Sequence, residues 1–261
     1  MKTVILIPAR FASTRYPGKP LAELRQKDGS NKTLIQMSWE AASAISGVAA
    51  VHVVTDDEKI RAHALGFGAS VIMTAPEREN GTARCAEAAA GLDADLIVNF
   101  QGDAPLTPPW FVEDLIAAMQ TDSAAQVATP VLQCDAQTYA MFAEDRRNDR
   151  VGGTTAVFGV DNRALYFSKE IVPYIAPGKL PETDIPVYHH VGVYAYRPEA
   201  LRAYTGWPES RLEQLEGLEQ LRFLVNGVPL RCVVVEARGR VFWELNNPED
   251  VARIEKVLAE S

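Results

Sequence analysis

Short apolar runs alternate with segments of helical spacing through the first half of the chain. Continuous β-branched and apolar runs predict buried strands, and apolar residues three and four positions apart predict helices that pack on them. The expected strands are 3–7, 50–54, 70–73 and 95–100, and the expected helices are 34–45, 58–65, 82–90 and 110–119. Strand–helix alternation at this spacing predicts βαβ units around a mostly parallel sheet, that is, an α/β fold.

The pattern changes in the middle of the chain and then returns. Segments 152–160 and 164–167 predict adjacent strands, 191–197 predicts another strand, and the proline-rich stretch 173–186 predicts a loop. After residue 200, the α/β pattern resumes with a helix at 212–224, a strand at 230–236 and a helix at 248–258.

We interpret residues 1–261 as one domain. The sequence marks a boundary near residue 130 only weakly, and two compact units would fit it equally well. Within it we expect an α/β half over 1–130 and a C-terminal α/β completion over 201–261. Between them, residues 131–200 are expected to form an antiparallel insertion that covers a pocket or makes a subunit interface.

Three polar segments follow predicted strands: 8–19, 55–57 and 101–105. Because ligands of parallel α/β sheets bind beyond the carboxyl ends of the strands, these segments should meet at one ligand-binding edge. Asp103 ends the central strand at this edge. The residues alone favour a turn or helix-start role for Asp103 before Pro105 over a role in ligand binding.

The first of these segments is rich in cations and hydroxyls. Arg10, Arg15 and Lys19 stand within ten residues, together with Ser13 and Thr14. Guanidinium forks and an ammonium point charge suit a polyphosphate. A solvated basic loop is the plainer alternative, but the segment directly follows a buried strand in an otherwise acidic chain.

Composition limits the partners. Lys plus Arg number 26 and Asp plus Glu 34, so the net charge is −8. A protein this acidic lacks the broad basic surface expected of a DNA or RNA binder. Walker, dinucleotide-binding and G-x-S-x-G motifs are absent. The three cysteines form no metal or disulfide spacing, and no apolar run is long enough to enter a membrane. We expect a reduced, cytoplasmic protein without membrane insertion.

The stretch IPARFASTRYPGKPL at 7–21 resembles the opening motif of 3-deoxy-manno-octulosonate (Kdo) cytidylyltransferases. The resemblance continues in order along nearly the whole chain, and the first motif is the specific one. The further motifs are GTAR at 81–84, NFQGD at 99–103, ALYFS at 164–168, HVGVYAYR at 190–197, LEQLR at 218–222 and NPED at 247–250.

The resemblance implies a Rossmann-like nucleotidyltransferase that uses CTP and Mg²⁺ and forms a homodimer. The anomeric hydroxyl of a sugar acid would attack the α-phosphate of CTP, giving a CMP-sugar and pyrophosphate. The resemblance assigns CTP binding to Ala9, Arg10, Ser13, Arg15, Lys19, Thr82, Arg84 and Gln101, and catalysis to Arg10, Lys19 and Asp103. The acceptor, an acidic small molecule, would be held by Gln101, Lys169, His190, Tyr194, Glu213 and Gln220.

The resemblance favours Asp103 as an oxygen ligand for Mg²⁺ over a turn residue, but the rest of the metal site departs from the family pattern. Asn246 stands where the family has a second aspartate ligand, and an amide oxygen brings no charge. Glu244 lies two residues upstream, on the same face of an extended segment. Either Glu244 substitutes for the missing carboxylate, or Asp103 and the phosphates hold the metal.

The acceptor side departs as well. Ala83, Ala104 and Thr155 replace charged residues of the family pattern, Lys169 replaces an arginine, and His189 replaces the arginine of an R-H-[IL]-G pattern. Lys does not reproduce the guanidinium fork of Arg. The acceptor could therefore be Kdo, an amino-sugar analogue of it, or another acid such as a phosphonate. A CTP-binding protein that has lost catalysis is the alternative of a different class.

For two groups of residues, a structural role is the alternative to a role in the pocket. Adjacent strand residues point to opposite faces, so at most one of His189 and His190 should face the pocket, and the resemblance favours His190. Helical spacing of Glu213, Glu216, Glu219 and Gln220 is typical of a solvated helix face.

Overall fold

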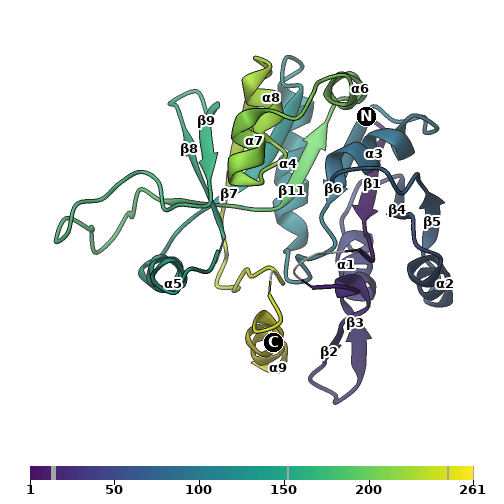
Figure 1. The fold of residues 1–261 in the computed structure, drawn as a ribbon, viewed down its shortest axis with the longest axis horizontal. Helices are drawn as coiled ribbons and strands as arrows, with labels where there is room; N and C mark the ends of the chain where they lie inside the picture. The colour runs from purple at the N-terminus through teal and green to yellow at the C-terminus, as the bar shows by residue number, and fades with distance from the viewer. Residues whose placement is uncertain (13–15, 152, 246, 261) are drawn as a thin grey trace.

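A mixed β-sheet forms the centre of the computed structural model, which describes residues 1–12, 16–151, 153–245 and 247–260 (Figure 1). The strand order is β5–β4–β1–β6–β11–β7–β10–β8–β9, with β12 paired to β7. The strands are β1 (Thr3–Pro8), β4 (Ala50–Thr55), β5 (Ser70–Met73), β6 (Leu96–Phe100), β7 (Val127–Gln133), β8 (Thr154–Phe158), β9 (Ala164–Ser168), β10 (Tyr188–His190), β11 (Val193–Tyr196) and β12 (Leu230–Val235).

The strand directions confirm an α/β fold with a mostly parallel sheet. Strands β1, β4, β5, β6, β7, β8 and β12 run one way, and β9, β10 and β11 run against them. The antiparallel strands come from the middle of the chain, as the sequence predicts. β7 lies across residue 130 and pairs with strands from both later segments.

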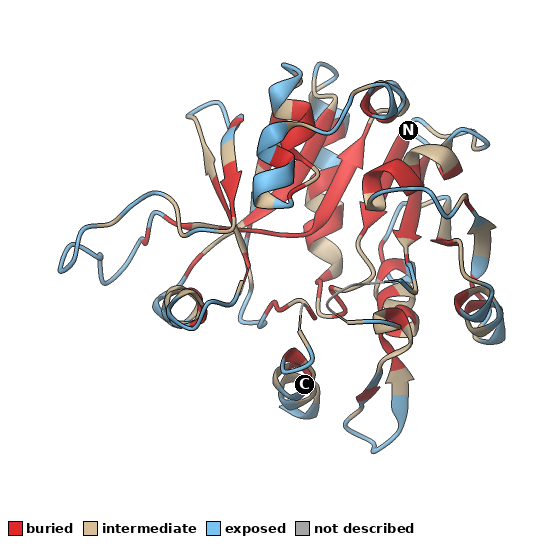
Figure 2. Ribbon diagram, in the orientation of Figure 1, coloured by how far each residue is buried: buried red, intermediate tan, exposed pale blue. Residues whose placement is uncertain are grey.

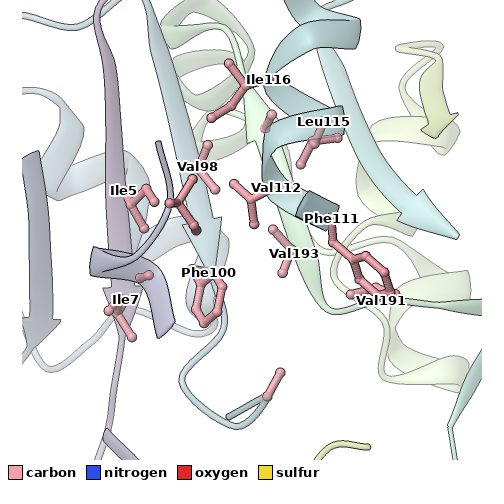
Figure 3. Close-up of a cluster of buried hydrophobic side chains, with 14 of the residues drawn as sticks. Ile5, Ile7, Val98, Phe100, Phe111, Val112, Leu115, Ile116, Val191 and Val193 are labelled. Atoms are coloured by element: carbon pink, nitrogen blue, oxygen red, sulfur yellow. The ribbon is translucent and has the colours of Figure 1, made fainter. Parts of the chain in front are cut away.

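Helices cover both faces of the sheet. One face packs against α1 (Leu34–Ser43), α2 (Glu58–Gly66) and α4 (Pro109–Thr121), and the other against α3 (Gly81–Ala89), α6 (Pro198–Thr205) and α8 (Leu221–Val225). Alternate residues of β1 divide between the two cores, because successive strand residues point to opposite faces. Figure 3 shows Ile5 and Val98 of neighbouring strands near Val112 of α4.

A third apolar cluster fixes the C-terminal segment. Trp243 and Leu245 precede α9 (Asp250–Glu260). They pack with Ile254 of α9 and with Phe142 of α5 (Ala136–Arg147). Leu24 of the hairpin β2 (Glu23–Arg25)–β3 (Asn31–Thr33) joins them. The segment between β9 and β10 leaves this body and is mostly exposed (Figures 1 and 2).

Capping residues explain where the first helices begin. Thr33 accepts a hydrogen bond from the backbone N–H of Gln36, and Asp57 accepts two from the first turn of α2. Asn80 accepts one from the N–H of Ala83. These contacts satisfy backbone donors that have no partner within the helix.

The structure corrects several predicted elements. The expected helix 212–224 is divided into α7 (Arg211–Glu216) and α8, because Gly217 adopts a left-handed conformation with φ of 61°. The expected strand 191–197 is observed as the shorter β11, and β10, which precedes it at Tyr188–His190, was not predicted. Strand β7, helices α5 and α6, the hairpin β2–β3 and the short 3₁₀ helix Lys19–Leu21 were not predicted. No helix among the described residues is both long enough and apolar enough to cross a membrane.

Candidate active site

A cavity of about 320 Å³ opens at the carboxyl ends of β1 and β6, the edge that the sequence predicts. Its wall brings together residues from well-separated parts of the chain. The predicted site residues that line it are Ala9, Arg10, Lys19, Arg84, Gln101, Asp103, Lys169, His190, Tyr194, Gln220 and Glu244.

Two predicted site residues lie behind the cavity wall instead. Thr82 is fully buried, with its hydroxyl 2.9 Å from the hydroxyl of Tyr196. Glu213 is also buried and accepts two hydrogen bonds of 2.7 Å from the guanidinium of Arg222. Both residues support the wall rather than line the cavity. Ser13, Arg15 and Asn246 lie outside the described residues.

An ion pair joins the loop after β1 to the end of β6. Lys19 Nζ is 2.8 Å from Asp103 Oδ2 and also donates to the carbonyl of Leu245, at 3.1 Å. The N–H of Leu245 in turn donates to the carbonyl of Asp103, at 2.8 Å. Three segments far apart in sequence are thereby held around one carboxylate.

The same carboxylate is the strongest candidate metal ligand. Asp103 Oδ1 is buried and has no hydrogen-bond partner among the described residues. Glu244 lines the same cavity, and its Oε1 accepts from the N–H of Gly192 at 3.1 Å. The described residues contain no group of three or more His, Cys, Asp or Glu side chains that could hold a metal. One or two carboxylates are nevertheless what Mg²⁺ uses when substrate phosphates complete its shell, so the residues fit that mode.

The two arginines of the cavity differ in their environment. Arg10 is exposed, with one hydrogen bond of 3.3 Å to the carbonyl of Glu79, so its guanidinium is accessible to an anion. Arg84 is buried, bonds to Thr74 and pairs with Asp56 at 3.3 Å. Because Asp56 already balances its charge, Arg84 shapes the wall more than it attracts phosphate.

Aromatic, amide and ammonium side chains also line the cavity. His190 and Tyr194 are buried, with ring centroids 5.3 Å apart. Gln220 is also buried, and its Nε2 has no partner among the described residues, so a donor is available to a ligand. Lys169 Nζ lies beside Gly217: a Cβ added there would be 2.7 Å away. The left-handed glycine therefore makes room for this ammonium group.

Glu219 is the residue that sequence reasoning missed. The expected solvated face of glutamates does not exist, because the chain turns at Gly217 and directs Glu219 into the cavity wall. Its carboxylate accepts from Gln101 Nε2 at 2.9 Å and from the N–H of Thr82 at 3.0 Å. Burial, aided by the charges of Glu213 and Asp103, raises the pKa of Glu219. Gly217 is the signal in the sequence that would have ended the helix.

The two adjacent histidines face opposite ways, as strand geometry requires. His190 lines the cavity, whereas His189 packs between Phe142 and Phe242 at ring distances of 4.8 and 5.2 Å. Burial lowers the pKa of His189 to about 4 and that of His190 to about 3. Both imidazoles are therefore neutral at neutral pH.

Comparison with known sequences finds cytidylyltransferases. A family model described as "Cytidylyltransferase" matches residues 4–234. The 3-deoxy-manno-octulosonate cytidylyltransferase of Maricaulis maris (strain MCS10) is 39% identical over 261 residues, covering 99% of this chain and 98% of the relative. The 8-amino-3,8-dideoxy-manno-octulosonate cytidylyltransferase of Shewanella sp. (strain ANA-3) is 37% identical and covers 99% of each.

A solved structure agrees in fold over the whole chain. CMP:2-keto-3-deoxy-manno-octonic acid synthetase complexed with CTP superposes with a TM-score of 0.84 at 35% identity. The match covers 100% of this chain and 99% of the other.

The buried histidine pair predicts a pH-dependent stability. An unfolded chain protonates its histidines near pH 6.5, but the folded chain keeps His189 neutral down to about pH 4. Stability should therefore be lost as the pH falls from 6.5 toward 4, by on the order of 3 kcal/mol for this residue. Urea unfolding of wild type and His189→Gln should show the gap between them narrowing from pH 7 to pH 5. A gap that stays constant would contradict this assignment.

Proposed function

The chain belongs to the cytidylyltransferase family, and on that premise we propose that it transfers CMP from CTP to a 3-deoxy-2-keto sugar acid of the Kdo type, releasing pyrophosphate. The observation that carries this function is the cavity at the sheet edge, in which accessible cations and an acidic side chain meet. Lys19 and Asp103 are the pair at its centre.

The cations of the loop after β1 are assigned to the triphosphate. Arg10 presents an accessible guanidinium at the cavity, and Lys19 lies deeper, beside Asp103. Ser13 and Arg15 are assigned to the same task from the motif alone. Positive groups held in place before reaction stabilise charge that develops on the departing pyrophosphate, so Lys19 is placed to assist bond breaking.

The reaction joins two bound substrates. The anomeric hydroxyl oxygen of the sugar acid forms a bond to the α-phosphorus while the bond from that phosphorus to the bridging oxygen breaks. Pyrophosphate leaves, and the proton of the hydroxyl passes to water. Gln101 follows β6, lines the cavity and donates a hydrogen bond to Glu219. Its role is to orient the acceptor.

Mg²⁺ is the proposed cofactor. Asp103 would hold it through Oδ1, which has no hydrogen-bond partner in the described part of the chain, with Glu244 as the second carboxylate and Asn246 as a neutral alternative. When bound, the cation neutralises negative charge on the triphosphate.

The acceptor's identity is open between two related sugars. The relatives named above act on Kdo and on its 8-amino analogue at nearly equal identity to this chain. We propose that Lys169, His190, Tyr194 and Gln220 hold the acceptor, because they line the same cavity as Arg10 and Lys19 and match the positions that the resemblance assigns to it. Lys169 is positioned to pair with a carboxylate as a point charge.

A second copy of the chain is the proposed partner. Strand β9 ends the strand order, and Leu165 on it is 66% exposed. Leu212 and Leu215 of α7 are exposed as well, and α7 contacts β9 through the hydrogen bond from Tyr166 to Glu216. Apolar groups on an unpaired edge are typical of an interface, and the mass of the chain in solution checks it.

A panel of acceptors tests the function. With CTP and Mg²⁺, pyrophosphate release should occur with Kdo or 8-amino-Kdo and be at least tenfold slower with a phosphonate, because a phosphonate lacks the hydroxyls and carboxylate that the proposed acceptor residues would bind. Pyrophosphate release with the phosphonate alone would show that the acceptor is not a sugar acid, while CMP transfer from CTP would still stand. Tight CTP binding without release for any acceptor would identify a protein that has lost catalysis.

A second test addresses the metal. Glu244→Gln should raise the Mg²⁺ concentration for half-maximal turnover by about tenfold, since a neutral amide replaces a charged ligand. Glu249→Gln is the matched control, because Glu249 lies five residues away and is exposed. Equal Mg²⁺ dependence of wild type and Glu244→Gln would show that Asp103 and the phosphates hold the metal without Glu244.

A further inference from the structure

Thr129, in the middle of β7, carries a fully buried hydroxyl that does not line the cavity. Its Oγ1 is 2.8 Å from the carbonyl oxygen of Val193 and 3.3 Å from that of Val191. The same oxygen is 3.0 Å from Nε2 of His190. One hydroxyl therefore contacts two carbonyls and one imidazole.

The proton positions follow from the chemistry of these groups. Carbonyl oxygens only accept, so the single hydroxyl proton of Thr129 is donated to a carbonyl, and the shorter contact is to Val193. The hydroxyl then offers a lone pair to His190. A contact of 3.0 Å between two lone pairs would be repulsive, so Nε2 of His190 carries the proton and donates it to Thr129.

The other ring nitrogen is consequently an acceptor. Burial holds His190 neutral, so a single ring proton is present and Nδ1 keeps its lone pair. Nδ1 has no hydrogen-bond partner among the described residues, while Phe167 and Tyr194 pack against the ring at 5.0 and 5.3 Å. His190 lines the cavity on its acceptor side.

We propose that Thr129 is a positioning residue that fixes the Nε2–H tautomer of His190, so that Nδ1 accepts a hydrogen bond from a hydroxyl of the acceptor sugar. This inference rests on the proposed function, because it concerns the same cavity. It also determines which part of the sugar acid lies there. A lone pair attracts a hydroxyl and repels a carboxylate, so the carboxylate must bind elsewhere in the cavity.

Replacement of Thr129 tests the inference through kinetics. Thr129→Val keeps the shape of the side chain and removes the hydroxyl, so the imidazole loses the partner that selects its tautomer. We expect the KM for the acceptor to rise about tenfold while the KM for CTP stays unchanged, and Thr129→Ser to restore most of the loss. An unchanged KM for the acceptor, or an equal rise in both KM values, would overturn the proposal.

The tautomer can be measured without activity. The chain has four histidines, so ¹⁵N-histidine NMR can resolve them, and loss of one signal set in His190→Gln assigns His190. The Nδ1 resonance should be that of an unprotonated nitrogen in wild type and in Thr129→Ser. A protonated Nδ1 in wild type would overturn the inference. If wild type releases no pyrophosphate with any acceptor, the proposed function fails, while the tautomer still decides the role of Thr129.

Discussion

The ion pair between Lys19 and Asp103 is the contact on which the site depends. It joins the loop after β1 to the end of β6, and the carbonyl of Leu245 shares the same ammonium. Both side chains remain partly accessible, at 18% and 22%, so the pair lies at the cavity wall and not in the core. A substrate phosphate or a cation can therefore reach it. The packing of the C-terminal segment around Trp243 and Leu245 keeps the third member of the contact in place.

Support for the acceptor side comes from buried polar groups behind the wall. Glu219 connects Gln101 to the start of α3, and the Glu213–Arg222 pair holds the turn that directs Glu219 inward. Polar networks held by several hydrogen bonds of this kind favour one arrangement of the side chains. Nε2 of Gln220 has no hydrogen-bond partner among the described residues and is available to donate to a ligand.

Most of the nucleotide side could be predicted from the sequence, because it depends on local patterns. Buried strands such as 3–7 and 95–100 are evident from their apolar runs, and parallel strands must bring Arg10, Lys19 and Asp103 to one edge. The acceptor side could be predicted only in part. Glu219 reaches the cavity because Gly217 adopts a left-handed conformation and ends α7, which helical spacing does not reveal. Thr82 and Glu213 matched family positions, yet tertiary packing gives them supporting positions behind the wall.

The central claim, that Lys19 and Asp103 work as one unit in CTP chemistry, is most directly tested by a double-mutant cycle on pyrophosphate release. Lys19→Met, Asp103→Asn and the double variant would be compared by kcat/KM for CTP. Because the two groups are in contact, we expect the losses of kcat/KM in the single variants to be far from additive in the double variant. The coupling free energy should be at least about 1 kcal/mol. Losses that add within error, or single variants with wild-type kcat/KM, would contradict it.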